Sequence, residues 1–281
     1  MKGKNLFTVF LFFFFAITIM SCHDDHDDDV EITNFQLDKH YYEVGLKIGN
    51  NINILNGSGD ISVAIEDEAI LSAIYSGRLY ADQLCGVVHL MGKSKGETTV
   101  TITDNVTHEK EIVNVKVTDS YLSYCIQSSN HPSLEEDVVV FLLNNSSQDF
   151  YAFQTDYMHH ALYTTPCGVG TYKFTVEKVT KEGNDEYIPY LTLNYTSDEK
   201  GNFIIAEILP TDHKFNILGS SQTAYGLLEA WLGVDWGNMI EHFTRTSYMP
   251  NPTLKLEDTE MGYTVLGHLN LEDKIPEKII E

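Results

Sequence analysis

The residues best suited to catalysis in this sequence are two histidines and a cysteine that follow one another closely. His159 and His160 precede Cys167 within one short stretch of the chain. A cysteine thiol activated by a histidine base would make this stretch part of a thiol hydrolase. Adjacent side chains of an extended strand point to opposite faces, so only one of the two histidines can serve. No cysteine-protease signature surrounds Cys167, and we therefore predict a structural role for these residues and no catalytic site.

The remaining cysteines and the acidic turns are candidates for a disulfide or a metal site. Cys125 and Cys167 fall in the same half of the chain, so they can form a disulfide in an exported protein or stay as free thiols. No cysteine pair, Cys85 included, has the spacing of zinc ligands. The turns at 184–186 and 198–202 are rich in side-chain oxygens, but each supplies fewer than the six that calcium requires. We therefore predict no metal and no other cofactor.

Both tryptophans, Trp231 and Trp236, lie close together in a stretch with helical periodicity. An exposed aromatic ring can stack on a sugar, which makes these two residues our candidate ligand-binding residues. Their apolar neighbours favour the alternative that both rings pack in the core. Further candidates for an exposed aromatic surface are Tyr41, Tyr42, Tyr151, Tyr157 and Tyr163.

The charge of the chain excludes nucleic acid as a partner. The 281 residues contain 41 acidic and 18 basic side chains, which gives a net charge of −23. Binding to phosphates requires a cationic face, and the only two arginines are Arg78 and Arg245. The hydrophobic content of 43% is that of a folded protein. A chain of this length is more typical of two modest domains than of one large domain.

The predicted strands and helices that position the candidate residues begin after a segment that directs export of the protein. Lys2 and Lys4 precede an apolar run at 6–20, which is shorter than the roughly 20 residues that a spanning helix needs. We interpret residues 1–21 as a signal peptide, with a retained anchor helix as the alternative. The following motif, Ile19-Met20-Ser21-Cys22, resembles the lipobox of bacterial lipoproteins. The resemblance implies that Cys22 is lipidated, becomes the new N-terminus and attaches the protein to a membrane.

An acidic tether follows the lipobox at residues 22–29. Five of the seven residues at 23–29 are aspartate and the other two are histidine. Mutually repelling carboxylates stay solvated, and weak binding of a divalent cation is the alternative. An acidic run directly behind the lipidated cysteine resembles the surface-export signal of Bacteroidetes lipoproteins. This resemblance implies attachment to the outer membrane with the body facing the cell exterior.

Residues 30–118 show the alternation of β-strands. The segments 31–37, 51–55, 98–103 and 112–117 alternate polar and apolar side chains. Glycine-rich turns at 56–60, 76–77 and 92–96 separate them. Several short strands at this spacing predict a β-sandwich.

Three segments of this region resemble the bacterial Ig-like group 2 domain. They are residues 67–74 (DEAILSAI), 76–80 (SGRLY) and 90–104 (LMGKSKGETTVTITD). The resemblance covers about 90 of the 281 residues. It implies an Ig-like β-sandwich without catalytic activity, of the kind that serves as a spacer, stalk or adhesive module on bacterial surfaces.

Residues 119–281 form a β-rich second domain that resembles no family we can name. We predict strands at 138–143, 171–179, 187–195 and 203–208, the last three as a meander. A helical segment at about 221–245, capped by Ser221 and in its second piece by Asp235, interrupts the strands. A hairpin at 253–256 and 263–271 closes the domain, and we expect the charged tail at 272–281 to fray.

The sequence thus predicts a mainly β protein, with an Ig-like β-sandwich followed by a β-rich domain that carries a short helical insert. We expect no enzyme but a surface-anchored adhesion or carbohydrate-binding lipoprotein. The lipid on Cys22 would hold it in the membrane, and the Ig-like domain would serve as spacer for a second domain that binds a glycan or a surface protein. Two alternatives remain open: a small hydrolase in the C-terminal domain that uses Cys167 or paired carboxylates, and a structural subunit of a surface fibre or complex.

Overall fold

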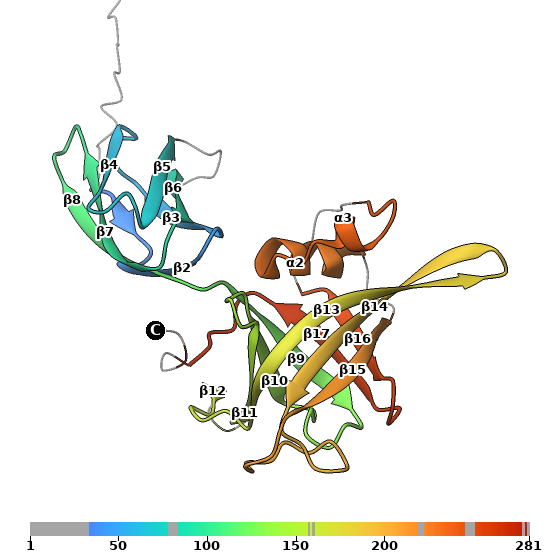
Figure 1. The fold of residues 1–281 in the computed structure, drawn as a ribbon. Coiled ribbons are helices and arrows are strands. Elements are labelled where there is room, and N and C mark those ends of the chain that lie inside the picture. Colours follow the sequence, from blue (N-terminus) through green and yellow to red (C-terminus); the bar gives the residue numbers. More distant parts are fainter. Residues whose placement is uncertain are drawn as a thin grey trace, which may run out of the picture. The chain divides into compact units, whose positions relative to one another are not determined.

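The structure is a computed structural model that describes residues 34–77, 84–156, 158, 161–218, 222–244, 251–276 and 279 (Figure 1). The chain divides into the segment Met1–Thr33 and a compact unit, Asn34–Glu281. The predicted signal peptide, Cys22 and the acidic tether all lie outside the described residues. Within the described part, no helix is both long and apolar enough to span a membrane. The protein is mainly β, with 57% strand, 6% helix and three sheets, which confirms the predicted fold class.

The first two sheets form an Ig-like sandwich. One sheet has the order β1-β3-β6-β5 and the other the order β2-β8-β7-β4. Only β2 and β8 pair in parallel, and the other pairs in both sheets are antiparallel. Strands that pair in this order on two facing sheets are characteristic of immunoglobulin sandwiches. The strands are β1 (Gln36–Leu37), β2 (Tyr41–Gly45), β3 (Gly49–Leu55), β4 (Ile61–Ile65), β5 (Leu71–Gly77), β6 (Leu84–Gly92), β7 (Gly96–Asp104) and β8 (Lys110–Thr118).

The alternation in the sequence places one face of each strand in the sandwich core. Along β8, Val113, Val115 and Val117 are buried, whereas Asn114 between them is exposed. At the end of β7, the fully buried Asp104 accepts hydrogen bonds from the backbone and hydroxyl groups of the turn residue Ser58, at 2.8 and 2.7 Å. The backbone N–H groups of residues 106 and 107 donate to the same carboxylate at 2.9 and 3.1 Å. This carboxylate therefore fastens two turns of the sandwich to each other.

The third sheet closes on itself, and we call it the closed sheet. Each of its eight main strands pairs antiparallel with the next one along the chain, and the last strand, β17, pairs with the first, β9. The short strand β12 pairs only with β11. The strands are β9 (Tyr121–Ser129), β10 (Val138–Leu143), β11 (Asp149–Asp156), β12 (Ala161–Leu162), β13 (Gly168–Lys181), β14 (Asn184–Tyr195), β15 (Thr211–Leu218), β16 (Thr253–Asp258) and β17 (Thr264–Asn270).

Apolar side chains fill the interior of the closed sheet. The helices α2 (Gln222–Leu232) and α3 (Trp236–Met239) cover the end at which β9 begins (Figure 1). Asp235 caps α3, as predicted, since its side chain accepts a hydrogen bond from the backbone of Asn238. Leu134 of the β9–β10 loop is buried in the same core. The remaining cavity, lined by leucine, valine, phenylalanine and tyrosine, measures about 10 Å³, which is room for at most about one water molecule.

Strand β10 is buried on both of its faces, which explains its unbroken apolar sequence VVVFLL. Val138, Val140 and Leu142 belong to the interior core, and the side chains between them form a second cluster on the outer surface. Ile275 of the C-terminal tail is 5% exposed and packs in that outer cluster. The prediction that the tail frays is therefore wrong for its described part, because the tail covers apolar side chains that β10 and β11 would otherwise leave exposed.

The predicted strand at 203–208 is wrong as well. Residues 196–210 form a loop, and the strand that follows β14 is Thr211–Leu218. Phe203 packs against the rings of Phe150 and Tyr195, at centroid distances of 6.4 and 4.7 Å. Ile205 and Leu209 are exposed. The apolar run at this position thus contributes one aromatic anchor and no paired strand.

Candidate functional site

The two tryptophans have different environments. Trp236 is fully buried, and its indole N–H donates a hydrogen bond to the backbone oxygen of Tyr225 at 3.0 Å. Its ring makes edge contacts with Phe174 and Tyr225, at centroid distances of 5.7 and 4.9 Å. Trp231 is partly buried and packs against the same core. Trp236 therefore serves packing, and only Trp231 of the two borders a surface pocket.

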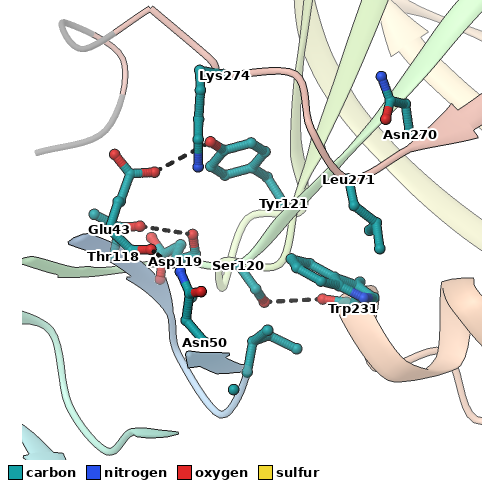
Figure 2. A pocket seen from close by; sticks show the side chains of 13 residues that line it. Glu43, Asn50, Thr118, Asp119, Ser120, Tyr121, Trp231, Asn270, Leu271 and Lys274 are labelled. Atoms are coloured by element: carbon teal, nitrogen blue, oxygen red, sulfur yellow. Dashed lines mark hydrogen bonds between the residues drawn. The ribbon is translucent and has the colours of Figure 1, made fainter. Parts of the chain in front are cut away.

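The pocket beside Trp231 has a volume of about 260 Å³ (Figure 2). Its polar groups largely bind one another. The Tyr121 hydroxyl donates to Glu43 at 3.2 Å, the Asn50 amide donates to the Glu43 backbone oxygen at 3.1 Å, and the Ser120 hydroxyl donates to the Trp231 backbone oxygen at 2.9 Å. A ligand here would have to replace bonds that already hold the chain together, so this pocket is a poor candidate for a binding site.

The cysteines have the properties of structural thiols. Cys85, Cys125 and Cys167 are all free, so the Cys125–Cys167 disulfide, which the sequence left open, is absent. The Cys125 thiol donates to Asp273 at 2.8 Å, and its burial, together with that carboxylate, raises its pKa to about 12. Burial also raises the pKa of Cys167, whose thiol contacts the backbone oxygen of Ala152 at 3.3 Å. A raised pKa is the opposite of what a thiol nucleophile needs. His159 and His160 lie outside the described residues.

The tyrosine candidates are spread over different environments. Tyr41 and Tyr163 are exposed, at 54% and 51%, Tyr151 is partly buried and Tyr42 is buried. Tyr157 lies outside the described residues.

A larger cavity, which we call the distal basin, lies at the other end of the closed sheet, with a volume of about 340 Å³. Strands β9, β14 and β16 end there, and β15 and β17 begin there. The chain enters the closed sheet at the start of β9, so the distal basin is at the end remote from this point. Its lining consists of His131, Ser197, Asp198, Glu199, Gly201, Thr211, Asp212, His213, Lys214, Asp258, Glu260, Met261 and Tyr263.

The floor of the distal basin is a hydrogen-bonded chain that starts at the buried His131. Its Nδ1 lies 3.2 and 3.0 Å from the backbone N–H groups of Ser133 and Leu134, and so must be the unprotonated acceptor. Its Nε2 then carries the proton and faces the Tyr195 hydroxyl at 3.3 Å, which donates onward to the Gly201 oxygen at 3.2 Å. Burial lowers the pKa of His131 to about 4, so the ring is neutral at ordinary pH.

His213 forms one wall of the distal basin. It stacks on the Tyr195 ring at a centroid distance of 4.1 Å and an interplanar angle of 15°. Its Nε2 lies 3.0 Å from the Ser197 hydroxyl and 3.1 Å from the Thr211 hydroxyl. Burial lowers the pKa of His213 as well.

The distance between the Ser197 hydroxyl and the His213 ring is that between a nucleophile and its base. The described residues do not complete this pair to a hydrolase triad. Thr211 occupies the same nitrogen, and the described residues place no hydrogen-bond partner on Nδ1, where a triad requires a third group. The cluster presents hydroxyl and imidazole groups for hydrogen bonding, as a recognition site does.

Asp258 is the most deeply buried carboxylate of the distal basin, with 4% of the residue exposed. Its Oδ1 accepts hydrogen bonds from the backbone N–H groups of Glu260 and Met261, at 2.8 and 2.6 Å. Within the described part of the chain, no donor reaches its second oxygen. The second oxygen keeps contact with the cavity and is open to a donor from outside the chain.

The sequence singled out Asp198 and its neighbours but not His131, His213, Asp258 or Tyr263. Asp198 closes its own turn, because it accepts hydrogen bonds from the backbone of Lys200 and from Asn202. Among the described residues, no group of three potential metal-ligating side chains comes together. The overlooked residues carry no local signal, since each belongs to a different loop or strand end.

Comparisons with known proteins identify no family. No family model matches the chain, and no curated protein matches it. Among solved structures, domains 5-6 of the S-layer protein SbsC align with 65% of this chain and 96% of that chain, at 14% identity and a TM-score of 0.26. Domains 4-9 of the same protein align with 82% of this chain and 38% of that chain, at 13% identity and a TM-score of 0.26. Values this low assign neither a family nor an activity.

Proposed function

We propose that this protein is a lipid-anchored, non-catalytic glycan-binding protein of the outer membrane whose binding site is the distal basin. The observation that carries the proposal is a 340 Å³ cavity, lined by hydroxyls, carboxylates and aromatic rings, at the end of the closed sheet remote from the point where the chain enters. The lipid on Cys22 and the acidic tether would hold the body outside the cell. The Ig-like sandwich would act as a spacer.

The packing of the closed sheet favours a binding site at its surface. Eight-stranded closed sheets either fill their interior with side chains or keep room for one small ligand. Here the interior cavity is about 10 Å³ and apolar, and α2 and α3 cover one end. The distal basin is the larger and more polar space, and its rim consists of loops that rigid strands hold in place.

The chemistry of the distal basin fits a sugar better than a protein surface. Sugars present closely spaced hydroxyl groups and an apolar ring face. Ser197, Thr211 and His213 hydrogen-bond one another at 3.0 to 3.1 Å, and the two hydroxyls, each with two lone pairs, can still accept further hydrogen bonds from a sugar. Tyr263 adds an aromatic ring at the rim. Protein interfaces instead rely on large apolar anchors in a dry centre.

A glycan array with the full mature chain, carrying Cys22→Ser to keep it free of lipid, tests the binding. We expect binding to one or more glycans, and a loss of about fivefold in affinity in Thr211→Val, because that change removes one neutral hydrogen-bonding group and keeps the shape. Thr103→Val, the same change on β7 of the sandwich, is the matched control and should bind as the wild type does. A blank array, or unchanged binding in Thr211→Val, would refute the proposal, and a protein captured despite a blank array would favour a protein partner.

The anchor is tested separately in cells. Cys22→Ala should move the protein from the membrane fraction to the soluble fraction, because it removes the atom that carries the lipid. Protease added to intact cells should digest the wild type. Membrane attachment of Cys22→Ala, or protection from protease, would contradict the proposed anchor and location.

A further inference from the structure

We propose that the distal basin selects glycans that carry free amino groups, and that Asp258 binds the ammonium. The inference rests on the proposed function, because it names the class of glycan that the same cavity takes. It predicts discrimination against two relatives of such a sugar: the N-acetylated form, which has lost the charge, and the uronic acid, which has the opposite charge.

The first observation is the half-satisfied carboxylate of Asp258. The two backbone bonds hold Oδ1, so the group is fixed in place before any ligand arrives. Its second oxygen has no donor from the described residues, although the residue is only 4% exposed. That oxygen keeps contact with solvent in the cavity, and hydrogen bonds between ionised groups are the strongest that a ligand could offer it. An ammonium supplies both the donor and the opposite charge.

The second observation is that carboxylates outnumber cations at the distal basin. Lys214 bonds to Glu177 and lies over the Tyr190 ring, with its nitrogen 3.9 Å from the ring centroid. Lys173 pairs with Asp212 at 3.2 Å. Within the described part of the chain, the lining carboxylates without a cationic partner are Glu199, Asp258 and Glu260, whereas Asp198 feels the charge of Lys200 in its own turn.

The two histidines do not offset this negative charge. Burial lowers the pKa of both His131 and His213, which favours the neutral form of each ring. The His131 ring accepts a hydrogen bond from the backbone, and the His213 ring shares one with a hydroxyl. The Tyr263 ring, 5.2 Å from that of His131, also lines the cavity and carries no charge that would repel a cation. The electrostatic potential of the cavity therefore favours a cation and repels a carboxylate.

Titration calorimetry with three tetrasaccharides tests the inference on the full mature chain with Cys22→Ser. The probes are the tetramer of glucosamine, the tetramer of N-acetylglucosamine and the tetramer of galacturonic acid, at about pH 6, where an amine of ordinary pKa is charged. We expect the glucosamine tetramer to bind about tenfold or more tightly than the N-acetylated tetramer. The galacturonic acid tetramer should show no binding.

Asp258→Asn is the decisive variant, because asparagine keeps the Oδ1 acceptor for the two backbone bonds, removes the charge and replaces the second oxygen by an amide NH2 donor. We expect affinity for the glucosamine tetramer to fall about tenfold or more, while affinity for the N-acetylated tetramer changes little. Glu260→Gln, an exposed change in the same cavity, should reduce binding of the amino sugar about two- to threefold. It keeps the inference testable if Asp258→Asn fails to fold. Glu68→Gln, an exposed change in the sandwich, alters the net charge equally and should have no effect.

The outcomes separate the inference from the proposed function. Equal or tighter binding of the N-acetylated tetramer would overturn the amino-sugar selectivity and leave glycan binding intact. So would an unchanged affinity for the glucosamine tetramer in Asp258→Asn, or an equal loss in Glu68→Gln. Failure of every glycan on the array to bind would overturn the proposed function itself.

Discussion

Acid should weaken this protein through one buried histidine. His131 is 1% exposed, and its neutral ring is held by two backbone donors at Nδ1 and by the Tyr195 hydroxyl at Nε2. A proton on Nδ1 would face two N–H groups and break both bonds. The rings of Phe215 and Tyr263 pack beside it, at 6.0 and 5.2 Å. Burial and the neighbouring His213 lower its pKa to about 4, although the charge of Asp258 acts in the opposite direction.

The size of the effect follows from the difference between the folded and unfolded states. The unfolded chain has the ordinary histidine pKa of 6.5, against about 4 in the folded protein. Between these values the unfolded state binds more protons, so the free energy of unfolding falls as the pH is lowered. A difference of about 2.5 in pKa corresponds to about 3 kcal/mol. The loss begins near pH 6.5, is nearly complete near pH 4, and does not grow below that through this residue.

Urea unfolding followed by tryptophan fluorescence measures this effect, because Trp231 and Trp236 both belong to the helical segment that packs on the closed sheet. We expect His131→Asn, whose side-chain oxygen can replace Nδ1 as acceptor, to be less stable at pH 7 by about 1 to 2 kcal/mol. It should also lose much less stability than the wild type as the pH falls to about 4. Burial lowers the pKa of His213 too, so His131→Asn should keep a part of the acid sensitivity of the wild type.

His108→Asn is the control, since His108 is exposed and its positive φ of 62° suits asparagine. It should keep the pH dependence of the wild type. Equal losses of stability in the wild type and in His131→Asn between pH 6.5 and 4 would show that His131 does not carry the acid sensitivity.

Three further changes test other parts of the fold. Asp104→Ala should lower the stability of the sandwich by about 2 to 3 kcal/mol, because it removes the acceptor of four partly buried hydrogen bonds. Although burial acts to raise the pKa of Asp104, its hydrogen bonds hold it at about 2, so the wild-type contribution falls only as the pH drops below about 4. Melting followed by circular dichroism measures both effects, and an unchanged melting temperature would contradict them. Ile275→Ala should free the C-terminal tail, with a loss of about 2 to 4 kcal/mol of local stability. If the amides of residues 271–276 exchanged hydrogen as slowly as in the wild type, this prediction would be wrong. Cys125 should react with iodoacetamide at neutral pH only after unfolding, because its pKa is raised to about 12. Mass spectrometry measures the labelling, and a labelled Cys125 peptide from the folded protein would show that the thiol is accessible and ionised.

The sequence predicted those strands in which the pattern of buried and exposed side chains is regular along the strand itself. Strands β7 and β8 alternate in both sequence and burial, and β10 has the same bounds as the predicted strand, because its six apolar residues are buried on both faces. Strand β9 was overlooked, because its sequence YLSYCIQSS mixes polar and apolar side chains on both faces. Ser123 is buried because its hydroxyl bonds to other segments, namely to Asn270 and Asp273. Such partners are far away in the sequence and leave no periodic signal.

The candidate site was hidden from the sequence for the same reason. The distal basin forms only when β17 pairs with β9 and closes the sheet. His131, His213 and Asp258 come together through that closure, although more than forty residues separate each from the next along the chain. No motif spacing can reveal a set of this kind. The two tryptophans stand out in the sequence because they are rare. They lie instead on the helical segment at the opposite end, where Trp236 fills the core.

The closure also limits where this chain can bind a ligand. A closed antiparallel sheet has no free edge for a partner strand in its eight main strands, and here its interior is full. One end is occupied by α2 and α3, and part of the outer surface is covered by the C-terminal tail. The loops at the other end leave an open cavity between them, although their Leu134 and Phe203 pack in or against the core. Because β9 starts at the first end and finishes at the second, a ligand in the distal basin approaches from the side opposite to the point where the chain enters.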